Sequence, residues 1–74
     1  MAGSVYNIVE LVGSSQNSWE EAAQNAIATA SKKLTNIRIA EIVELDATIE
    51  GKRIVEYRAK IRLSFKVEIE PETL

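Results

Sequence analysis

Apolar and polar residues alternate strictly from residue 55 to residue 69. One set of alternate positions is apolar or aromatic: Val55, Tyr57, Ala59, Ile61, Leu63, Phe65, Val67 and Ile69. The positions between them hold Glu56, Arg58, Lys60, Arg62, Ser64, Lys66 and Glu68. A period of two is typical of a β-strand with one buried face and one solvent-exposed face. The stretch therefore predicts a long strand, which Pro71 ends because proline cannot donate to a strand ladder.

Two earlier segments also predict strands. Residues 5–12 (VYNIVELV) are rich in β-branched residues and contain neither Gly nor Pro. Residues 37–49 are apolar at their odd positions, except at Glu41. Residues 13–17 (GSSQN) predict a turn. Glu50-Gly51 predicts a tight reversal, because glycine readily adopts positive φ.

Residues 18–34 predict a helix between the first two strands. Ser18-Trp19-Glu20-Glu21 matches the capping box, in which the serine hydroxyl accepts from the N–H of Glu21 and the Glu21 carboxylate accepts from the N–H of Ser18. An apolar stripe recurs at spacings of three and four. The stripe consists of Trp19, Ala22, Ala23, Ala26, Ile27, Ala30 and Leu34. Because most of these residues are alanines, we expect the helix to lie close against the sheet.

These elements predict one α+β domain over residues 1–74, with the order β-α-β-β and a three-stranded antiparallel sheet. The helix would be about 25 Å long, at 1.5 Å per residue. The third strand would be close to 50 Å long, at roughly 3.3 Å per residue. The helix can cover only about half of that strand. We therefore expect the rest of the apolar face to be buried against other copies of the chain.

The composition narrows the chemistry that the chain can perform. It has 74 residues, a net charge of −2, no cysteine and no histidine. Disulfides, thiolate or imidazole metal sites and histidine acid–base catalysis are thereby excluded. No nucleophile–base pair or phosphate loop is visible, so we do not expect an enzyme. Interleaved charges do not favour nucleic acid binding, and no apolar run could span a membrane. The N-terminal residues lack the features of a signal peptide, so we expect a cytoplasmic protein.

Three segments carry a family resemblance. SVYNIVELVGSSQNSWEEAAQNAI, NIRIAEIVE and EYRAKIRLSFKVE together resemble the dodecin family over nearly the whole chain. The resemblance implies a hollow homo-dodecamer of β-α-β-β subunits, each with a curved sheet wrapped around its own helix. It also implies a non-enzymatic binding and storage role. The SWE helix start and the IR-Ile-Ala segment are similar to the tryptophan-less, calcium-binding branch of the family.

The resemblance also implies where a ligand would bind. Flavin-binding dodecins stack a second-strand tryptophan on the isoalloxazine ring and hydrogen-bond the ring's polar edge with a third-strand glutamine. The corresponding positions in this chain are Ile39 and Arg58, with Glu41 and Tyr57 as possible pocket neighbours. Isoleucine has no π-face, and arginine has no hydrogen-bond acceptor. We therefore expect affinity for riboflavin or FMN to be reduced or lost.

Several residues allow more than one interpretation. Glu41 could be a buried carboxylate paired with Arg58 or Arg62, or a ligand or metal contact. Glu44, Asp46 and Glu50 could supply oxygen ligands for Ca²⁺, if symmetry-related copies add more, or could be solvated charges. Trp19 could hold the helix against the sheet or act as a stacking platform. The functional alternatives are a dodecin with weakened flavin binding, a calcium-binding dodecin and a ligand-free structural cage.

Overall fold

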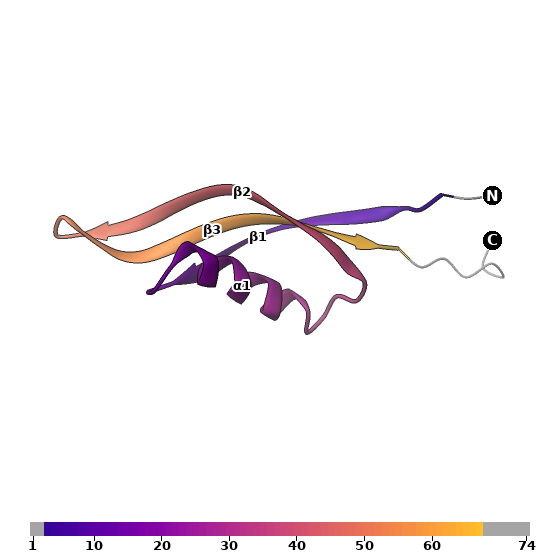
Figure 1. The fold of residues 1–74 in the computed structure, drawn as a ribbon, viewed down its shortest axis with the longest axis horizontal. Helices are drawn as coiled ribbons and strands as arrows, with labels where there is room; N and C mark the ends of the chain where they lie inside the picture. The colour runs from indigo at the N-terminus through magenta and orange to yellow at the C-terminus, as the bar shows by residue number, and fades with distance from the viewer. Residues whose placement is uncertain (1–2, 68–74) are drawn as a thin grey trace.

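The computed structural model describes residues 3–67, and these form the β-α-β-β order expected from the sequence (Figure 1). The elements are β1 (Tyr6–Ser15), α1 (Trp19–Ala30), β2 (Ile37–Glu50) and β3 (Arg53–Lys66). The strands form one antiparallel sheet in the order β1-β3-β2, so β3 is central and pairs with both neighbours. Ile69 and Pro71, which we expected at the end of the third strand, lie outside the described residues.

The helix packs on β1 and β3 through alanines. Ala22, Ala26 and Ala30 are buried against Ala59, Ile61 and Leu63 of β3. The closest approach is at Gly13 of β1, where a Cβ would overlap the carbonyl oxygen of Ala22 and lie 2.9 Å from the Cβ of Ala26. Small residues on both elements therefore bring the helix axis close to the sheet, as the alanine stripe predicted. Gly13–Ser15 continue β1 under the helix, so the predicted turn at these residues was wrong.

The ends of the helix differ in part from expectation. The N–H of Glu21 donates to the hydroxyl of Ser18 over 3.0 Å, which confirms the N-cap. The Glu21 carboxylate does not reach back to Ser18, because it accepts from the hydroxyl of Ser15 and from the side-chain amide of Asn17 instead. These two hydrogen bonds lower the pKa of Glu21 below its usual value. The helix ends at Ala30 with Ser31 as its C-cap, so the predicted end at residue 34 was wrong.

The β2–β3 hairpin turns at Gly51 and Lys52, which both have positive φ (56° and 70°). Two consecutive left-handed residues are the geometry of a type I′ hairpin turn, whose twist matches that of the flanking strands. The reversal therefore lies one residue later than Glu50-Gly51. This turn fixes which residues of β2 and β3 face each other.

The pairing of β2 with β3 contains three register shifts, which leave Arg38, Val43 and Val55 without a partner in the ladder. Each extra residue is a β-bulge, and each bulge changes whether odd or even positions point toward the helix. On β2, the residues paired with the buried side of β3 are consequently Ile37, Ala40, Ile42, Leu45 and Ala47. Glu41 pairs with Arg62 and points to the opposite side of the sheet. The expectation that the odd positions of residues 37–49 share one apolar face, interrupted only by Glu41, was therefore wrong.

The single chain is far from compact. Its extents are 58 × 20 × 15 Å and its radius of gyration is 15.9 Å, whereas a compact chain of this length has a radius of gyration of about 11 Å. Many large hydrophobic side chains remain exposed: Val5, Tyr6, Ile8, Val12, Trp19, Ile39, Ile42, Val43, Leu45, Ile49, Ile54 and Val55. The 12-residue helix covers only part of the 14-residue strands. The expected mismatch between helix and sheet is thus present.

Within residues 3–67, no helix is long and apolar enough to cross a membrane.

Candidate functional site

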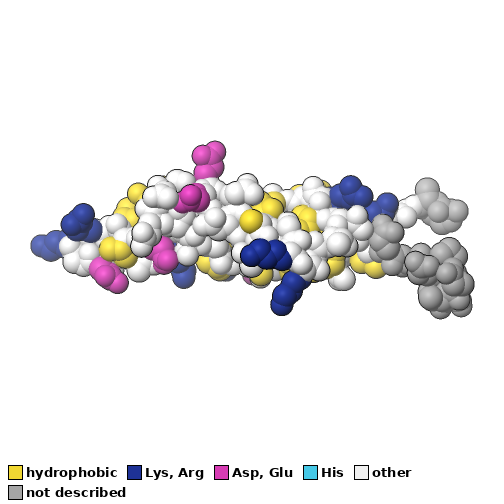
Figure 2. Space-filling view, turned by 90° about the horizontal axis from the view of Figure 1, so that it is seen from below, with side chains coloured by type: hydrophobic (Ala, Val, Ile, Leu, Met, Phe, Trp, Pro, Cys, Tyr) yellow, Lys and Arg dark blue, Asp and Glu magenta, His cyan; other side chains and the backbone are white. Residues whose placement is uncertain are grey.

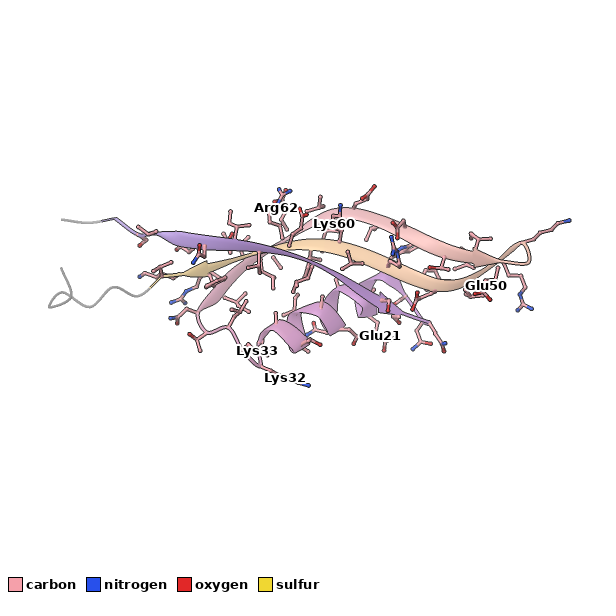
Figure 3. All side chains as sticks on the ribbon, turned by 180° about the vertical axis from the view of Figure 1, so that it is seen from behind. Glu21, Lys32, Lys33, Glu50, Lys60 and Arg62 are labelled. Carbon is pink, nitrogen blue, oxygen red and sulfur yellow. The ribbon has the colours of Figure 1, made fainter. Side chains whose placement is uncertain are left out.

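The face of the sheet turned away from α1 carries a ladder of opposite charges, which we call the charged face. Its residues are Glu10, Glu41, Glu44, Asp46, Arg58, Lys60 and Arg62. Figure 3 shows Lys60 and Arg62 projecting from the sheet on the side opposite the helix. Every basic residue in the ladder lies on the central strand, and each is the register partner of an acidic residue on β2. Cross-strand pairing therefore explains the alternation of basic residues along β3.

Arg58 and Asp46 form a bidentate ion pair. Its Nε and Nη2 atoms donate to the two carboxylate oxygens of Asp46 over 2.7 and 2.9 Å. This geometry matches the planar fork of the guanidinium to the carboxylate. The hydrogen bonds from Arg58 lower the pKa of Asp46, and those to Asp46 raise the pKa of Arg58. Two of the donors of Arg58 are thus occupied within the chain.

Arg62 bridges all three strands. Its Nη2 donates to Glu10 of β1 over 2.9 Å, and its Nη1 donates to Glu41 of β2 over 3.3 Å. Of the two partners considered for Glu41, Arg62 is the one observed. The Glu41 side chain is exposed in the single chain, because the bulges turn it to the charged face. The pKa of Arg62 is raised, chiefly by its hydrogen bond to Glu10.

Ile39 lies on the same face as Arg58 but at some distance from it. Ile39 is opposite Ser64 of β3, and Ser64 is in turn opposite Ile8 of β1. Ile39 and Ile8 are both largely exposed, at 60% and 58%. Ser64 lies six positions beyond Arg58 on β3, which corresponds to about 20 Å along the strand. A single chain therefore does not bring Ile39 and Arg58 together around one ring-sized ligand.

Tyr57 and Trp19 lie on the helix side of the sheet. Their ring centroids are 4.8 Å apart in an edge-to-face arrangement at 72°. The indole N–H of Trp19 donates to the backbone carbonyl of Asp46 over 2.8 Å. Trp19 therefore joins the start of the helix to β2, which matches its expected role of holding the helix against the sheet. Tyr57 directly precedes Arg58 on the strand but projects from the opposite face, so its role as a pocket neighbour stays a prediction.

Two of the three proposed calcium ligands, Glu44 and Asp46, are paired with cations in the single chain. Lys60 lies 3.7 Å from Glu44, and Arg58 pairs with Asp46. Across residues 3–67, no group of three or more His, Cys, Asp or Glu side chains converges as metal ligands would. Because Ca²⁺ takes six to eight oxygen ligands, a calcium site would need carboxylates or carbonyls from more than one chain.

The sequence interpretation missed the pairing of Asp46 with Arg58. The position of the hairpin turn could have predicted most of this pairing. A two-residue turn at Gly51 and Lys52 sets Glu50 opposite Arg53, and counting back from this pair brings residue 46 within one position of residue 58. The bulge at Val55 shifts the register by the one remaining position, and no pattern in the sequence predicts this bulge.

The dodecin family model matches residues 5–68. The calcium dodecin of Mycobacterium tuberculosis is 36% identical over 64 residues, which cover 86% of this chain and 90% of that protein. Its crystal structure, described as having a novel calcium-binding site, superposes with a TM-score of 0.78 over 92% of this chain and 94% of its own. A dodecin of Thermus thermophilus is 38% identical over 66 residues, covering 89% and 96% of the two chains. A tryptophan-to-phenylalanine variant of that dodecin has a TM-score of 0.85, with 37% identity, over 90% and 100% of the chains.

Proposed function

Because this chain belongs to the dodecin family, we propose that it forms a homo-dodecameric, non-enzymatic binding and storage protein with reduced or lost affinity for flavins. The observation that carries the proposal is the state of the two positions that would hold a flavin. Ile39 is an exposed aliphatic residue, and Arg58 is already bound to Asp46. A cytoplasmic location, with neither nucleic acid nor membrane as partner, stays a prediction.

Self-assembly is supported by the surface of the single chain. Ile39 and Ile8 on the charged face, and Ile42 and Leu45 on the helix face, are each about half exposed or more. Burying such side chains contributes roughly 1.5–3 kcal/mol each. A single core in a chain of about 70 residues rarely supplies more than 3–5 kcal/mol. Contacts between copies are therefore needed to make the fold stable.

Weak flavin binding follows from the chemistry of the two substituted positions. An aromatic contact with a ring contributes about 0.5–1.5 kcal/mol beyond the burial of area, and isoleucine cannot supply it. A loss of about 1.4 kcal/mol is a tenfold loss of affinity. Arg58 has donors only, so it cannot accept the ring N–H of a flavin. Asp46 already occupies two of the donors of Arg58, so a ligand that needs the same edge of the guanidinium would have to displace the Asp46 carboxylate.

Titration of the purified assembly into riboflavin, followed by quenching of flavin fluorescence, tests the proposal. We expect dissociation constants at least tenfold above those of the double variant Ile39→Trp/Arg58→Gln, which restores an aromatic face and an amide. Val12→Trp is the matched control, because Val12 is also about half exposed and lies on the same face. Nanomolar riboflavin binding by the unaltered protein would refute the proposed loss.

Calcium binding is a second candidate function. It is favoured by the 36% identity to the calcium dodecin of Mycobacterium tuberculosis, whose structure has a calcium site. Carboxylates of the charged face, among them Glu44 and Asp46, would have to combine with oxygen atoms of neighbouring copies. This proposal predicts a melting temperature that rises with Ca²⁺ and falls with EDTA. An EDTA-insensitive melting temperature, with no heat of Ca²⁺ binding in calorimetry, would contradict it.

A further inference from the structure

The end of the β2–β3 hairpin extends beyond the rest of the molecule. β1 pairs with β3 only as far as Tyr57, so residues 48–56 form a two-stranded arm that lacks a third strand and a helix. Figure 1 shows this arm projecting past the start of α1. Ile49 and Ile54 are register partners at its end and are 57% and 48% exposed. An isolated two-stranded hairpin is at best marginally stable in water, so the arm needs a surface to pack on.

The same side of the sheet offers an apolar groove. Because α1 lies over β1 and β3, the inner side of β2 stays uncovered, and Ile42 and Leu45 are 50% and 49% exposed there. These two residues, with Trp19, Glu20 and Ala23 of the helix, line a hollow of about 240 Å³. We call it the Trp19 groove. Glu20 is its charged member, and no ion pair to Glu20 occurs within the described residues.

We infer that the arm of one copy docks in the Trp19 groove of a second copy, with Lys52 of the arm against Glu20 of the groove. The inference rests on the proposed assembly and names one of its contacts. Ile49 and Ile54 would enter the groove against Ile42 and Leu45. The arm cannot fold back into the groove of its own chain, because it runs away from Asp46, the residue that Trp19 contacts: Glu50, at the end of β2, already lies four strand positions, or about 13 Å, beyond Asp46.

Surface area supports a second copy as the occupant. The chain exposes 5702 Å², whereas a compact protein of 8.2 kDa exposes about 4,500 Å². The excess is larger than the roughly 800 Å² that each partner buries in a standard interface. A small ligand could cover the groove but would leave the arm bare.

The charges beside the two apolar hollows indicate which of them would receive the arm. The second hollow lies at the other end of the helix, lined by Val9, Leu11, Thr29, Ala30, Lys32, Lys33 and Leu34. Figure 3 shows Lys32 and Lys33 together there and Glu50 near the tip of the arm. Glu50 is the register partner of Arg53, which leaves Lys52 as the unbalanced charge of the turn. In the view from the helix side, Lys and Arg side chains lie at the tip with an acidic side chain beside them (Figure 2). The two-lysine rim would therefore repel Lys52 of the tip, and Glu20 would attract it.

Cysteine pairing tests the contact, since the chain has no native cysteine. We expect Glu20→Cys/Lys52→Cys to form disulfide-linked dimers or trimers under mild oxidation, because the Cα atoms of a disulfide lie 4.4–6.8 Å apart and the two sites of one chain are too distant. The matched control is Lys32→Cys/Lys52→Cys, which we expect to stay unlinked. Linkage of the control pair, or no linkage of the first pair in an assembly of unchanged native mass, would overturn the inference while leaving the proposed assembly intact. A monomeric native mass would overturn both.

Charge reversal tests the same contact without cysteine. Glu20→Lys and Lys52→Glu should each raise the protein concentration at which half of the assembly dissociates by at least threefold. The combined variant should return it to within twofold of the parent, because the pair is restored with its signs exchanged. Lys32→Glu serves as the control and should shift it by less than twofold. Failure of the combined variant to recover would overturn the inference.

Discussion

Replacement of Gly13 by alanine should show how closely the helix lies on the sheet. The new methyl group would overlap the carbonyl oxygen of Ala22 and lie 2.9 Å from the Cβ of Ala26. Neither neighbour can rotate away, since one is backbone and the other is the first side-chain atom. Overpacking of this kind costs typically 1–3 kcal/mol. The stiffer unfolded chain offsets about 0.4–1 kcal/mol. We therefore expect the free energy of unfolding to fall by about 1–2 kcal/mol.

Gly51 provides the matched control for this prediction. It has a positive φ of 56° and nothing within 4 Å of a Cβ position, so alanine there meets strain but no clash. Asparagine tolerates such a conformation, and we expect Gly51→Asn to cost less than Gly51→Ala. At position 13 we expect the opposite order, with Gly13→Asn costing more than Gly13→Ala, because the larger side chain of asparagine worsens the overlap.

Urea unfolding at a fixed protein concentration measures these effects. Trp19, the only tryptophan, reports through its fluorescence, because it contacts Tyr57 and the backbone of Asp46. The concentration must be fixed since the stability of an oligomer depends on it. A Gly13→Ala protein whose free energy of unfolding lies within 0.5 kcal/mol of the parent would refute the claim that helix and sheet touch at this glycine.

Three further results are expected. Trp19→Phe keeps the ring contact but loses the hydrogen bond to the carbonyl of Asp46, so urea unfolding should show a loss of about 0.5–1.5 kcal/mol, and an unchanged value would mean that this bond contributes nothing. Arg58 lowers the pKa of Asp46 in the folded chain, so the ion pair stabilises the fold above the unfolded pKa, and its contribution is lost as the pH falls below about 4. Asp46→Asn should therefore weaken the dependence of the free energy of unfolding on pH in this acidic range, and an unaltered dependence would contradict the pairing. Leu63→Glu places a charge at a fully buried position, and circular dichroism and native mass should show an unfolded, unassembled chain instead of a folded monomer.

The order and type of the elements followed from periodicity, because the patterns are long and locally consistent. The alternation around Ile61 and Leu63 identified the central strand, and the alanine stripe identified the helix that packs on it. The N-cap at Ser18 was also predictable, since its chemistry is local.

The faces of the second strand could not be predicted in the same way. A single bulge reverses every following residue, and bulges at Arg38 and Val43 are encoded by no turn residue or proline. Glu41 was therefore placed on the wrong face, although one of its two expected partners, Arg62, was right. The end of the helix was also missed. The apolar Leu34 continues the periodic stripe beyond Ala30, but the chain already leaves the helix at the C-cap Ser31.

The candidate ligand positions depend on contacts that one chain does not contain. Ile39 and Arg58 came from a family resemblance, and their register positions lie about 20 Å apart on one sheet. No local sequence pattern predicts how two copies would bring these two positions together. The pairing of Arg58 with Asp46, by contrast, is contained within the single chain.

Native mass spectrometry of the purified protein at low micromolar concentration tests the central claim most directly. The claim is that a sheet much longer than its helix requires other copies of the chain to cover it. We expect a single dominant species of about 98 kDa, which corresponds to twelve chains of 8.2 kDa. A folded monomer of 8.2 kDa that persists at that concentration would contradict the assembly and the ligand sites proposed on it.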